Sequence, residues 1–193
     1  MNNIKEELTE FFRFLTEKSL YSLSGEDMMR LVNNKAKLLV YDELVNYKNI
    51  NDLLEPYGAV IILYVYEINN NSEIGHWTCL FMNPSTKIVE FFDSYGYKPD
   101  EERKFIPKNI WKNFYLSNIL NTISKNKEVL IEYNQYDYQG RSYKDVATCG
   151  RWVGMRILLK HLTNKEFAKL FYSPNKIENN LLISFITYKI INK

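Results

Sequence analysis

Cys149 stands between a polar loop and a strongly apolar segment, in the sequence Thr148-Cys149-Gly150. If the apolar segment is a helix, Thr148 caps its N-terminus and the sulfur lies in the first turn. Unpaired backbone N–H groups and the helix dipole favour a thiolate there. Because Gly150 has no side chain, a substrate backbone could approach the sulfur closely. Cys149 is therefore a candidate nucleophile; the alternative is a small buried apolar side chain that begins a core helix.

His76 is the second candidate, at the start of a predicted strand in Gly75-His76-Trp77. The turn at 83–86, Asn-Pro-Ser-Thr, leads into the next predicted strand, and antiparallel pairing across it places His76 opposite Asp93 or Ser94. A carboxylate beside an imidazole fixes its tautomer and stabilises its cationic form. We therefore expect a His76–Asp93 pair, although an aspartate at the end of a strand also commonly caps a turn.

The chain has two glutamines, Gln135 and Gln139, and both lie in the polar loop before Cys149. Acyl transfer to a cysteine places negative charge on a carbonyl oxygen. A side-chain amide N–H can stabilise that charge together with the backbone N–H of the cysteine. Gln139 is nearer to Cys149 and precedes a glycine, so we prefer it as the donor. Gln135 remains an alternative donor. A further alternative is that both glutamines are solvated loop residues.

The other cysteine and histidine are expected to be structural. Cys79 alternates to the opposite strand face from His76, which indicates packing in the core. His161 lies near the end of an apolar helix, where an imidazolium suits the helix dipole. The chain has only two cysteines and two histidines, none at ligand spacing. We therefore expect no metal site.

The elements that must position these residues follow from apolar periodicity. Short β-branched or aromatic runs predict strands at 59–66, 76–82, 87–92 and 129–133. Helical spacing predicts helices through much of 1–57, where Ser24 and Asp27 can cap one of them, at 108–124 and through 163–193. The segment 149–162 is apolar on nearly every face and is predicted to be a buried central helix.

These patterns predict one α+β domain over residues 1–193, in three parts. A mostly helical N-terminal part, 1–57, precedes the core that carries the candidate residues, 58–162, and C-terminal helices follow at 163–193. The chain is 46% hydrophobic and 15% aromatic, which excludes a disordered chain.

The net charge and the absence of targeting signals exclude further classes of protein. The formal net charge of +2 gives no bulk attraction to nucleic acid or to an anionic membrane. The N-terminus has no basic region followed by an apolar run, so we expect no secretory signal. The longest apolar run, 59–66, is far shorter than the ~20 residues of a membrane-spanning helix. We expect an intracellular protein that is not secreted and does not enter a membrane.

Taken in order, Gly75-His76-Trp77, Asp93, Gln139 and Thr148-Cys149-Gly150 resemble the adenovirus-type maturation cysteine proteases and the related ubiquitin-like-protein proteases. The resemblance covers about residues 58–162. It implies an adenain-like, papain-like α+β fold in which a central buried helix carries the nucleophile and packs on a mixed sheet.

The resemblance also implies roles for these residues. Cys149 would be the nucleophile, His76 the general base, Asp93 its orienting acid and Gln139 the oxyanion donor. Trp77 would pack over the Cys–His dyad, and Trp77 and Gly150 would contact substrate. The glutamine of the family usually lies closer to the cysteine, where this chain has Ser142 and Tyr143. Gln139 therefore departs from the family pattern.

The function implied is a virus-encoded cysteine endopeptidase that cleaves capsid or core precursor proteins during virion maturation. We expect a monomer that acts in the host-cell cytoplasm or virus factory and is packaged in the virion. No cofactor is expected, although some such proteases use a peptide or DNA activator; the net charge gives no support for strong DNA binding. The alternatives are a deconjugating protease for ubiquitin-like modifiers and a catalytically silent binding protein of the same fold.

Overall fold

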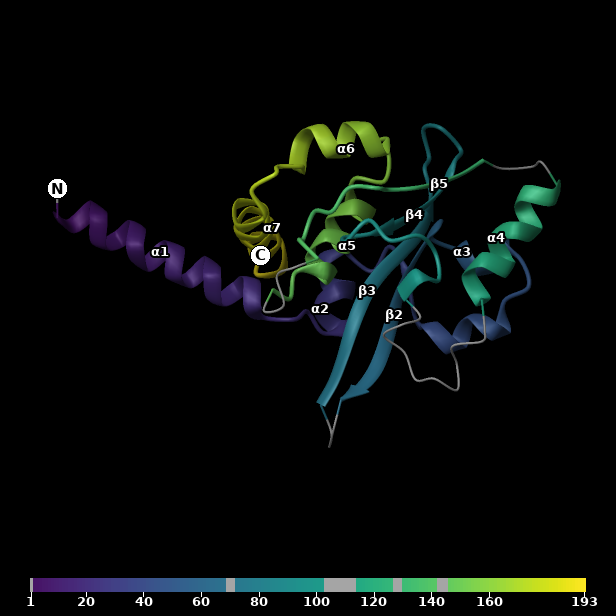
Figure 1. Ribbon diagram of the computed structural model, residues 1–193, viewed down its shortest axis with the longest axis horizontal. Coiled ribbons are helices and arrows are strands. Elements are labelled where there is room, and N and C mark those ends of the chain that lie inside the picture. Colours follow the sequence, from purple (N-terminus) through teal and green to yellow (C-terminus); the bar gives the residue numbers. More distant parts are fainter. Residues whose placement is uncertain (1, 69–71, 103–113, 127–129, 142–145) are drawn as a thin grey trace.

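A five-stranded sheet in the order β1-β2-β3-β4-β5 forms the centre of the protein (Figure 1). The computed structural model describes residues 2–68, 72–102, 114–126, 130–141 and 146–193. β1 is parallel to β2, β4 is parallel to β5, and the pairs β2–β3 and β3–β4 are antiparallel. The strands are β1 (Lys37–Val40), β2 (Ala59–Ile68), β3 (Ser72–Met82), β4 (Val89–Asp93) and β5 (Ile131–Tyr133).

The predicted α+β class is confirmed, and each of the four predicted strands corresponds to one of β2 to β5. β1 was not predicted, because a short Lys-Leu-Leu-Val run within an otherwise helical region gives little periodicity. Its parallel partner β2 follows only after η1 and α3, so no hairpin signal marks the pairing.

Helices cover both faces of the sheet. They are α1 (Asn2–Leu20), α2 (Gly25–Leu31), the 3-10 helix η1 (Tyr41–Asn46), α3 (Ile50–Leu54), α4 (Tyr115–Asn126), α5 (Cys149–Leu158), α6 (Asn164–Phe171) and α7 (Lys176–Ile191). Ser24 and Asp27 form the predicted capping box of α2. Of the helix predicted at 108–124, the part from Tyr115 onward is confirmed; positions 108–113 lie outside the described residues.

Alternation along the strands divides the core into two layers. Ile61 on β2 and Cys79 on β3 face the layer formed with α2, α5, α6 and α7. Val60 and Leu80 face the opposite layer, formed with η1, α3 and α4. Because both faces of the sheet are covered, β2 is a continuous apolar run rather than an alternating one.

Helix α5 is the central helix that the sequence predicts, and every residue from Cys149 to Ile157 is buried. It packs mainly on β3 (Figure 1). Two of its buried side chains are charged, Arg151 and Arg156. The Arg156 guanidinium makes two hydrogen bonds to Glu90 on β4, at 2.8 and 2.7 Å. This ion pair ties the helix that begins at Cys149 to the middle of the sheet.

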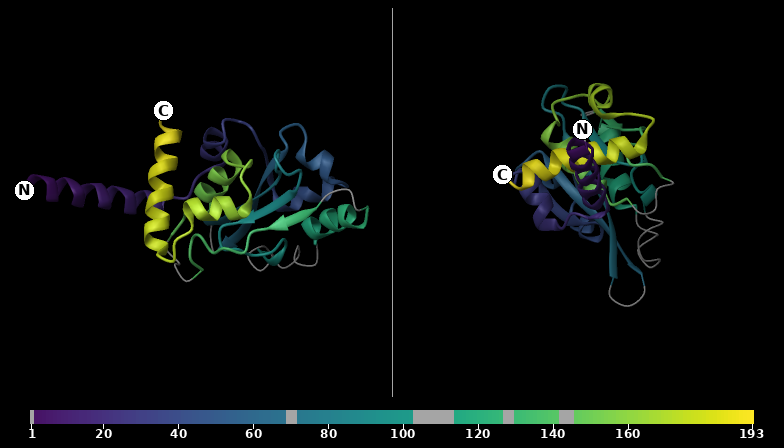
Figure 2. Two further views of the ribbon diagram at one scale, coloured as in Figure 1. Left: turned by 90° about the horizontal axis from the view of Figure 1, so that it is seen from above. Right: turned by 90° about the vertical axis from the view of Figure 1, so that its left-hand side faces the viewer.

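Helix α1 extends away from the rest of the protein, and its C-terminal half crosses α7 (Figures 1 and 2). Phe11 packs edge-to-face on Phe185 at a ring distance of 5.6 Å, and Phe14 packs on Tyr188 at 5.0 Å. In the described part of the chain, none of the helices combines the length and the apolar character that crossing a membrane would need.

Candidate active site

The site lies where β3 continues past the end of β4. The ladder between these strands stops at the pair Thr78–Asp93, whereas β3 runs back to Ser72. His76 is therefore on a stretch of β3 that pairs with β2 but has no β4 beside it. The N-terminus of α5 approaches His76 at this open end.

His76 and Asp93 form a buried pair, as the sequence predicts. Nε2 of His76 lies 2.7 Å from Oδ2 of Asp93, and both side chains are almost fully buried. The predicted register was wrong, because Asp93 lies opposite Thr78 and not opposite His76. The connection 83–88 is longer than a tight turn on Pro84 and Ser85, since Asn83 N–H closes it on the carbonyl of Ile88.

The His76–Asp93 contact forms in spite of the different register because side chains alternate along a strand. His76 and Thr78 point to the same face of β3, so Asp93 reaches His76 along the diagonal of the ladder. The backbone of Asp93 is held by Asn134, whose side-chain amide both accepts from the Asp93 N–H at 2.9 Å and donates to its carbonyl at 2.8 Å. No sequence pattern indicates this role of Asn134, because only the fold brings the residue to β4.

Cys149 is the first residue of α5, and its predicted place in the first helical turn is confirmed. Thr148 occupies the N-cap position, but its predicted capping role is wrong: the structure gives it no side-chain capping hydrogen bond. Its hydroxyl donates instead to Oδ1 of Asn180 on α7, at 2.6 Å. The helix end is thus fixed against α7, and the backbone N–H of Gly150 in its first turn is hydrogen-bonded to the Cys149 sulfur.

The Cys149 thiol and the His76 imidazole are hydrogen-bonded to each other. Since Nε2 of His76 faces Asp93, Nδ1 is the nitrogen left for the sulfur. Burial raises the pKa of the Cys149 thiol. The hydrogen bond and charge of His76 outweigh this effect, helped by the backbone N–H groups of Trp77 and Gly150, and leave the pKa below the ordinary value.

The imidazole shifts in the opposite direction. Burial lowers the pKa of His76, but the charge and hydrogen bond of Asp93, the hydrogen bond with Cys149 and the charge of Glu102 hold it well above its ordinary value. A thiol with a lowered pKa beside an imidazole with a raised pKa forms a thiolate–imidazolium pair near neutral pH. The arrangement can therefore attack an electrophilic carbon and return a proton to a leaving group.

Gln139 and Gln135 have different environments. Gln139 is 1% exposed, accepts a hydrogen bond from the Ser94 hydroxyl at 2.9 Å and donates one N–H to the carbonyl of Val146 at 2.7 Å. Gln135 has an exposed side chain. Of the two candidates, only Gln139 is thus held in a fixed orientation; its role in charge stabilisation stays a prediction. Ser142 and Tyr143, at the position of the family's glutamine, lie outside the described residues.

Trp77 and Gly150 meet in the core beside the pair. A Cβ on Gly150 would lie 2.8 Å from Sδ of Met28 and 3.0 Å from Cδ1 of Trp77, so the glycine lets α5 approach the indole closely. The indole N–H donates to the carbonyl of Leu23 at 3.1 Å. Contact of these two residues with substrate stays a prediction. The ring stacked on His76 is Tyr95, at 5.0 Å between centroids and 19° between planes.

Glu102 is a further residue at the site. It is fully buried, and its Oε1 lies 3.9 Å from Nε2 of His76. A run Asp-Glu-Glu at 100–102 after a proline has the appearance of a solvated loop, so no sequence signal points to the site. His76, Asp93 and Glu102 offer ligand atoms within 4.8 Å of one another, and these three residues could hold a metal ion.

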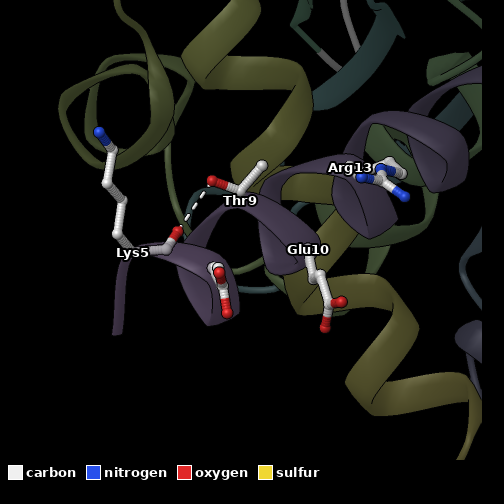
Figure 3. Close-up of a pocket in the computed structure, with 5 residues that line it drawn as sticks. Lys5, Thr9, Glu10 and Arg13 are labelled. Atoms are coloured by element: carbon white, nitrogen blue, oxygen red, sulfur yellow. Dashed lines mark hydrogen bonds between the residues drawn. The ribbon is translucent and has the colours of Figure 1, made fainter. Parts of the chain in front are cut away.

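Two other features lie apart from this site. Cys79 is fully buried in the core below α5, and burial raises the pKa of its thiol, as its predicted packing role requires. A surface pocket lies along α1, where the segment leads away from the body of the protein (Figure 3). Its lining residues are Lys5, Glu6, Thr9, Glu10 and Arg13.

A virophage protein is a close relative of this chain in sequence. Uncharacterized protein V9 of the Sputnik virophage is 37% identical over 172 residues, which cover 86% of this chain and 94% of that protein. No known family model matches the sequence.

Three solved structures are more distantly similar. The ASFV pS273R protease has a TM-score of 0.48 at 11% identity, over 86% of this chain and 68% of that one. ChlaDub1 from Chlamydia trachomatis has a TM-score of 0.41 at 10% identity, over 89% and 80%. The C-terminal Ulp1 protease domain, solved in complex with Smt3, the yeast ortholog of SUMO, has a TM-score of 0.37 at 14% identity, over 95% and 83%.

Proposed function

The chain belongs to the same family as protein V9 of the Sputnik virophage, and from the geometry of its site we propose that it is a cysteine peptidase. The observation that carries the proposal is the buried, hydrogen-bonded Cys149–His76 pair at the N-terminus of α5, with Asp93 behind the imidazole. A binding protein that had lost activity would have no need to keep a thiol of lowered pKa against an imidazole of raised pKa.

In the proposed reaction the Cys149 thiolate attacks the carbonyl carbon of the scissile amide and forms a C–S bond. The charge that develops on the carbonyl oxygen is stabilised by the backbone N–H of Cys149 and by the second N–H of the Gln139 amide. The His76 imidazolium then donates its proton to the departing amine nitrogen as the C–N bond breaks, and a thioester remains on Cys149.

Hydrolysis of the thioester reverses these roles. Neutral His76 takes a proton from a water molecule, whose oxygen attacks the thioester carbonyl. The C–S bond breaks, the product leaves as a carboxylic acid, and Cys149 returns to the thiolate with His76 protonated. Asp93 accepts a hydrogen bond from Nε2 of His76 throughout, so the imidazole keeps its orientation and its positive form is stabilised.

We propose capsid or core precursor proteins as the substrates. The relative from a virophage supports a viral context. The resemblance in the order of His76, Asp93, Gln139 and Cys149 to maturation proteases supports precursor cleavage. Removal of a ubiquitin-like modifier uses the same chemistry on an amide that follows glycine, and it is the second candidate.

The experiment offers both substrate classes to the purified protein. Capsid and core precursors of the virus that encodes the chain, and a ubiquitin-like modifier with a C-terminal Gly-Gly amide, are incubated with wild type and with Cys149→Ala. New termini are identified by mass spectrometry. Precursor cleavage by wild type alone supports the maturation role, and release of the amide alone supports the deconjugating role. Equal cleavage by Cys149→Ala would refute the peptidase assignment.

A further inference from the structure

Arg151 is a buried arginine two residues after the candidate nucleophile. Its side chain belongs to α5 and is only 2% exposed, and the mechanism proposed above gives it no role. In the described part of the chain it forms no ion pair with a carboxylate. A buried guanidinium is costly unless its N–H groups are hydrogen-bonded, so its partners show what the residue holds in place.

The guanidinium joins α5 to two other helices. Nη1 of Arg151 donates to the Thr187 hydroxyl of α7 at 2.9 Å, and Nη2 donates to the carbonyl of Lys18, in the last turn of α1, at 2.9 Å. The carbonyl of Tyr21, just past the end of α1, lies 3.5 Å from Nη2. Because the guanidinium is planar and its N–H groups have fixed directions, these contacts set the position of α5 relative to both helices.

The end of α1 also holds the chain just before the nucleophile. The Ala147 N–H donates to the carbonyl of Ser19 at 2.9 Å. Ala147 and Arg151 lie two residues before and two residues after Cys149. Both therefore bind carbonyls at the C-terminal end of α1, where the helix dipole favours a cation such as a guanidinium.

The same stretch of chain, residues 18–23, reaches the strand that carries the imidazole. The carbonyl of Leu23 accepts a hydrogen bond from the indole N–H of Trp77, the residue after His76, at 3.1 Å. The backbone N–H of Trp77 is in turn hydrogen-bonded to the Cys149 sulfur. Residues 18–23 thus contact both α5 and β3, the two elements whose relative position brings sulfur and imidazole together.

Packing on α7 fixes the end of α1 in turn. The ring of Phe14 packs edge-to-face on Tyr188 at 5.0 Å, where α1 crosses α7 (Figure 2). The Lys18 ammonium lies over both rings, at 5.2 Å from the centroid of Phe14 and 5.4 Å from that of Tyr188. The residue whose carbonyl accepts from Arg151 is therefore itself held at the α1–α7 crossing.

We propose that Arg151 is a positioning residue: by joining the end of α1 and α7 to the first turns of α5, it keeps the Cys149 sulfur in contact with the His76 imidazole. The consequence for catalysis rests on the proposed peptidase function. Two residues correspond to a rotation of about 200° around a helix, so Arg151 projects from the opposite side of α5 to the sulfur. It acts through the placement of α5 and does not touch the reacting atoms.

The activity test uses the full-length protein with Arg151→Met, Arg151→Lys and Arg156→Met. A displacement of about 1 Å at the reacting groups can cost about a hundredfold in rate, so we expect Arg151→Met to lose up to about 10²-fold in kcat with KM little changed. Arg151→Lys should recover part of this loss, since an ammonium can replace one of the two contacts but lacks the planar fork. Arg156→Met removes the other buried arginine of α5, two turns from the sulfur, and the folded protein should keep its kcat.

Two results of the activity test would overturn the proposal: an equal loss of kcat in folded Arg156→Met, or a change in Arg151→Met that is confined to KM. Thr187→Val removes only the α7 contact of the guanidinium. It keeps the test valid where Arg151→Met does not fold, and we expect a smaller loss of kcat in the same direction. A wild-type kcat in both Thr187→Val and Arg151→Lys would also overturn the proposal.

Hydrogen–deuterium exchange tests the positioning role without peptidase activity. The Ala147 N–H and the last turn of α1 should exchange about tenfold faster or more in Arg151→Met than in the wild-type protein, because hydrogen bonds from a charged group are lost. Exchange in α4, which packs on the other face of the sheet, should not change. If wild type cleaves no substrate but this local acceleration is seen, the peptidase function fails and the positioning of α5 by Arg151 stands. Unchanged exchange at Ala147, or equal acceleration in α4, would overturn the proposal.

Discussion

Asp93 is the Cα partner of Thr78 in the β3–β4 ladder, and its Oδ2 lies 2.7 Å from Nε2 of His76, the next residue along that face of β3. The carboxylate is therefore offset along the strand from the residue it orients. Its position depends on three fixed points: the ladder, the Asn134 amide and the Tyr95 N–H. The imidazole is held between this carboxylate and the sulfur of Cys149.

We expect Asp93→Asn to lower kcat/KM by about 10²–10⁴-fold, because the amide carries no charge to stabilise the imidazolium of His76. The charge of Asp93 raises the pKa of His76, so its removal lowers that pKa. The alkaline limit of kcat/KM should then move to lower pH, where the imidazolium loses its proton earlier. The pH–rate profile measures this. An unchanged alkaline limit would show that Asp93 does not stabilise the imidazolium; Thr78→Val is the control.

The prediction of the His76–Asp93 pair from sequence succeeded in spite of an incorrect register. Strand alternation depends only on the sequence of each strand, and it placed both side chains on one face. The register depends on the geometry of the connection, and Lys87 adopts a left-handed conformation within it that the sequence does not reveal. Local patterns therefore predicted which residues face the site, whereas the turn determined the register in which β3 and β4 pair.

Contacts between distant segments could not be predicted in the same way. Asn134, Glu102 and Tyr95 reach His76 and Asp93 from segments whose positions depend on the completed fold. Helix α5 was predicted because its apolar faces are a local property of the sequence. The choice between Gln139 and Gln135 needed burial, which spacing alone does not determine.

We expect Gln139→Ala to lower kcat by about 10²–10³-fold, the usual effect of removing one oxyanion donor. Gln135→Ala should leave kcat close to wild type, since its side chain is exposed. Gln139 also accepts a hydrogen bond from Ser94. Ser94→Ala is therefore the control, because it removes that contact and leaves the amide N–H groups in place. The kcat of each variant is measured by steady-state kinetics on a cleaved peptide. A similar loss in Ser94→Ala would argue for a structural role of Gln139.

Arg156→Met is expected to lower the free energy of unfolding by about 3–5 kcal/mol, because it leaves the buried Glu90 carboxyl without its cation. Burial raises the pKa of Glu90 to about 7 despite Arg156. A raised folded-state pKa means that ionisation of Glu90 opposes folding, so its effect on stability becomes less favourable as the pH rises from about 4 to about 7. The deficit of Arg156→Met should therefore be larger at pH 8 than at pH 5.

Urea denaturation at the two pH values measures this difference. Arg30→Met is the matched control, since Arg30 and Glu26 form an ion pair with side chains 59% and 75% exposed. That variant should change the free energy of unfolding by less than about 0.5 kcal/mol. Comparable losses in Arg156→Met and Arg30→Met would contradict the account of the buried pair.

Gly154→Ala tests the close packing of α5 on α2. A Cβ at Gly154 would lie 2.2 Å from Cδ2 and 2.7 Å from Cγ of Leu31. We expect a loss of about 1–3 kcal/mol in the free energy of unfolding, from overpacking. Combined with Leu31→Ala, the substitution should cost less than the sum of the two single effects. Gly25→Ala, whose Cβ would meet only an ordinary contact at 3.5 Å, is the control. Full additivity in the double variant would contradict the packing account.

The measurement that most directly tests the Cys149–His76 pair is the rate at which iodoacetamide alkylates Cys149 as a function of pH. Cys79 is buried with a raised pKa and should not react, and Cys79→Ala removes any doubt about the site of labelling. In the wild-type protein, alkylation should persist well below the ordinary cysteine pKa of about 8.5, because His76 stabilises the thiolate. In His76→Ala the rate should follow a pKa at or above that value. Coincident profiles for the two proteins would contradict the thiolate–imidazolium pair.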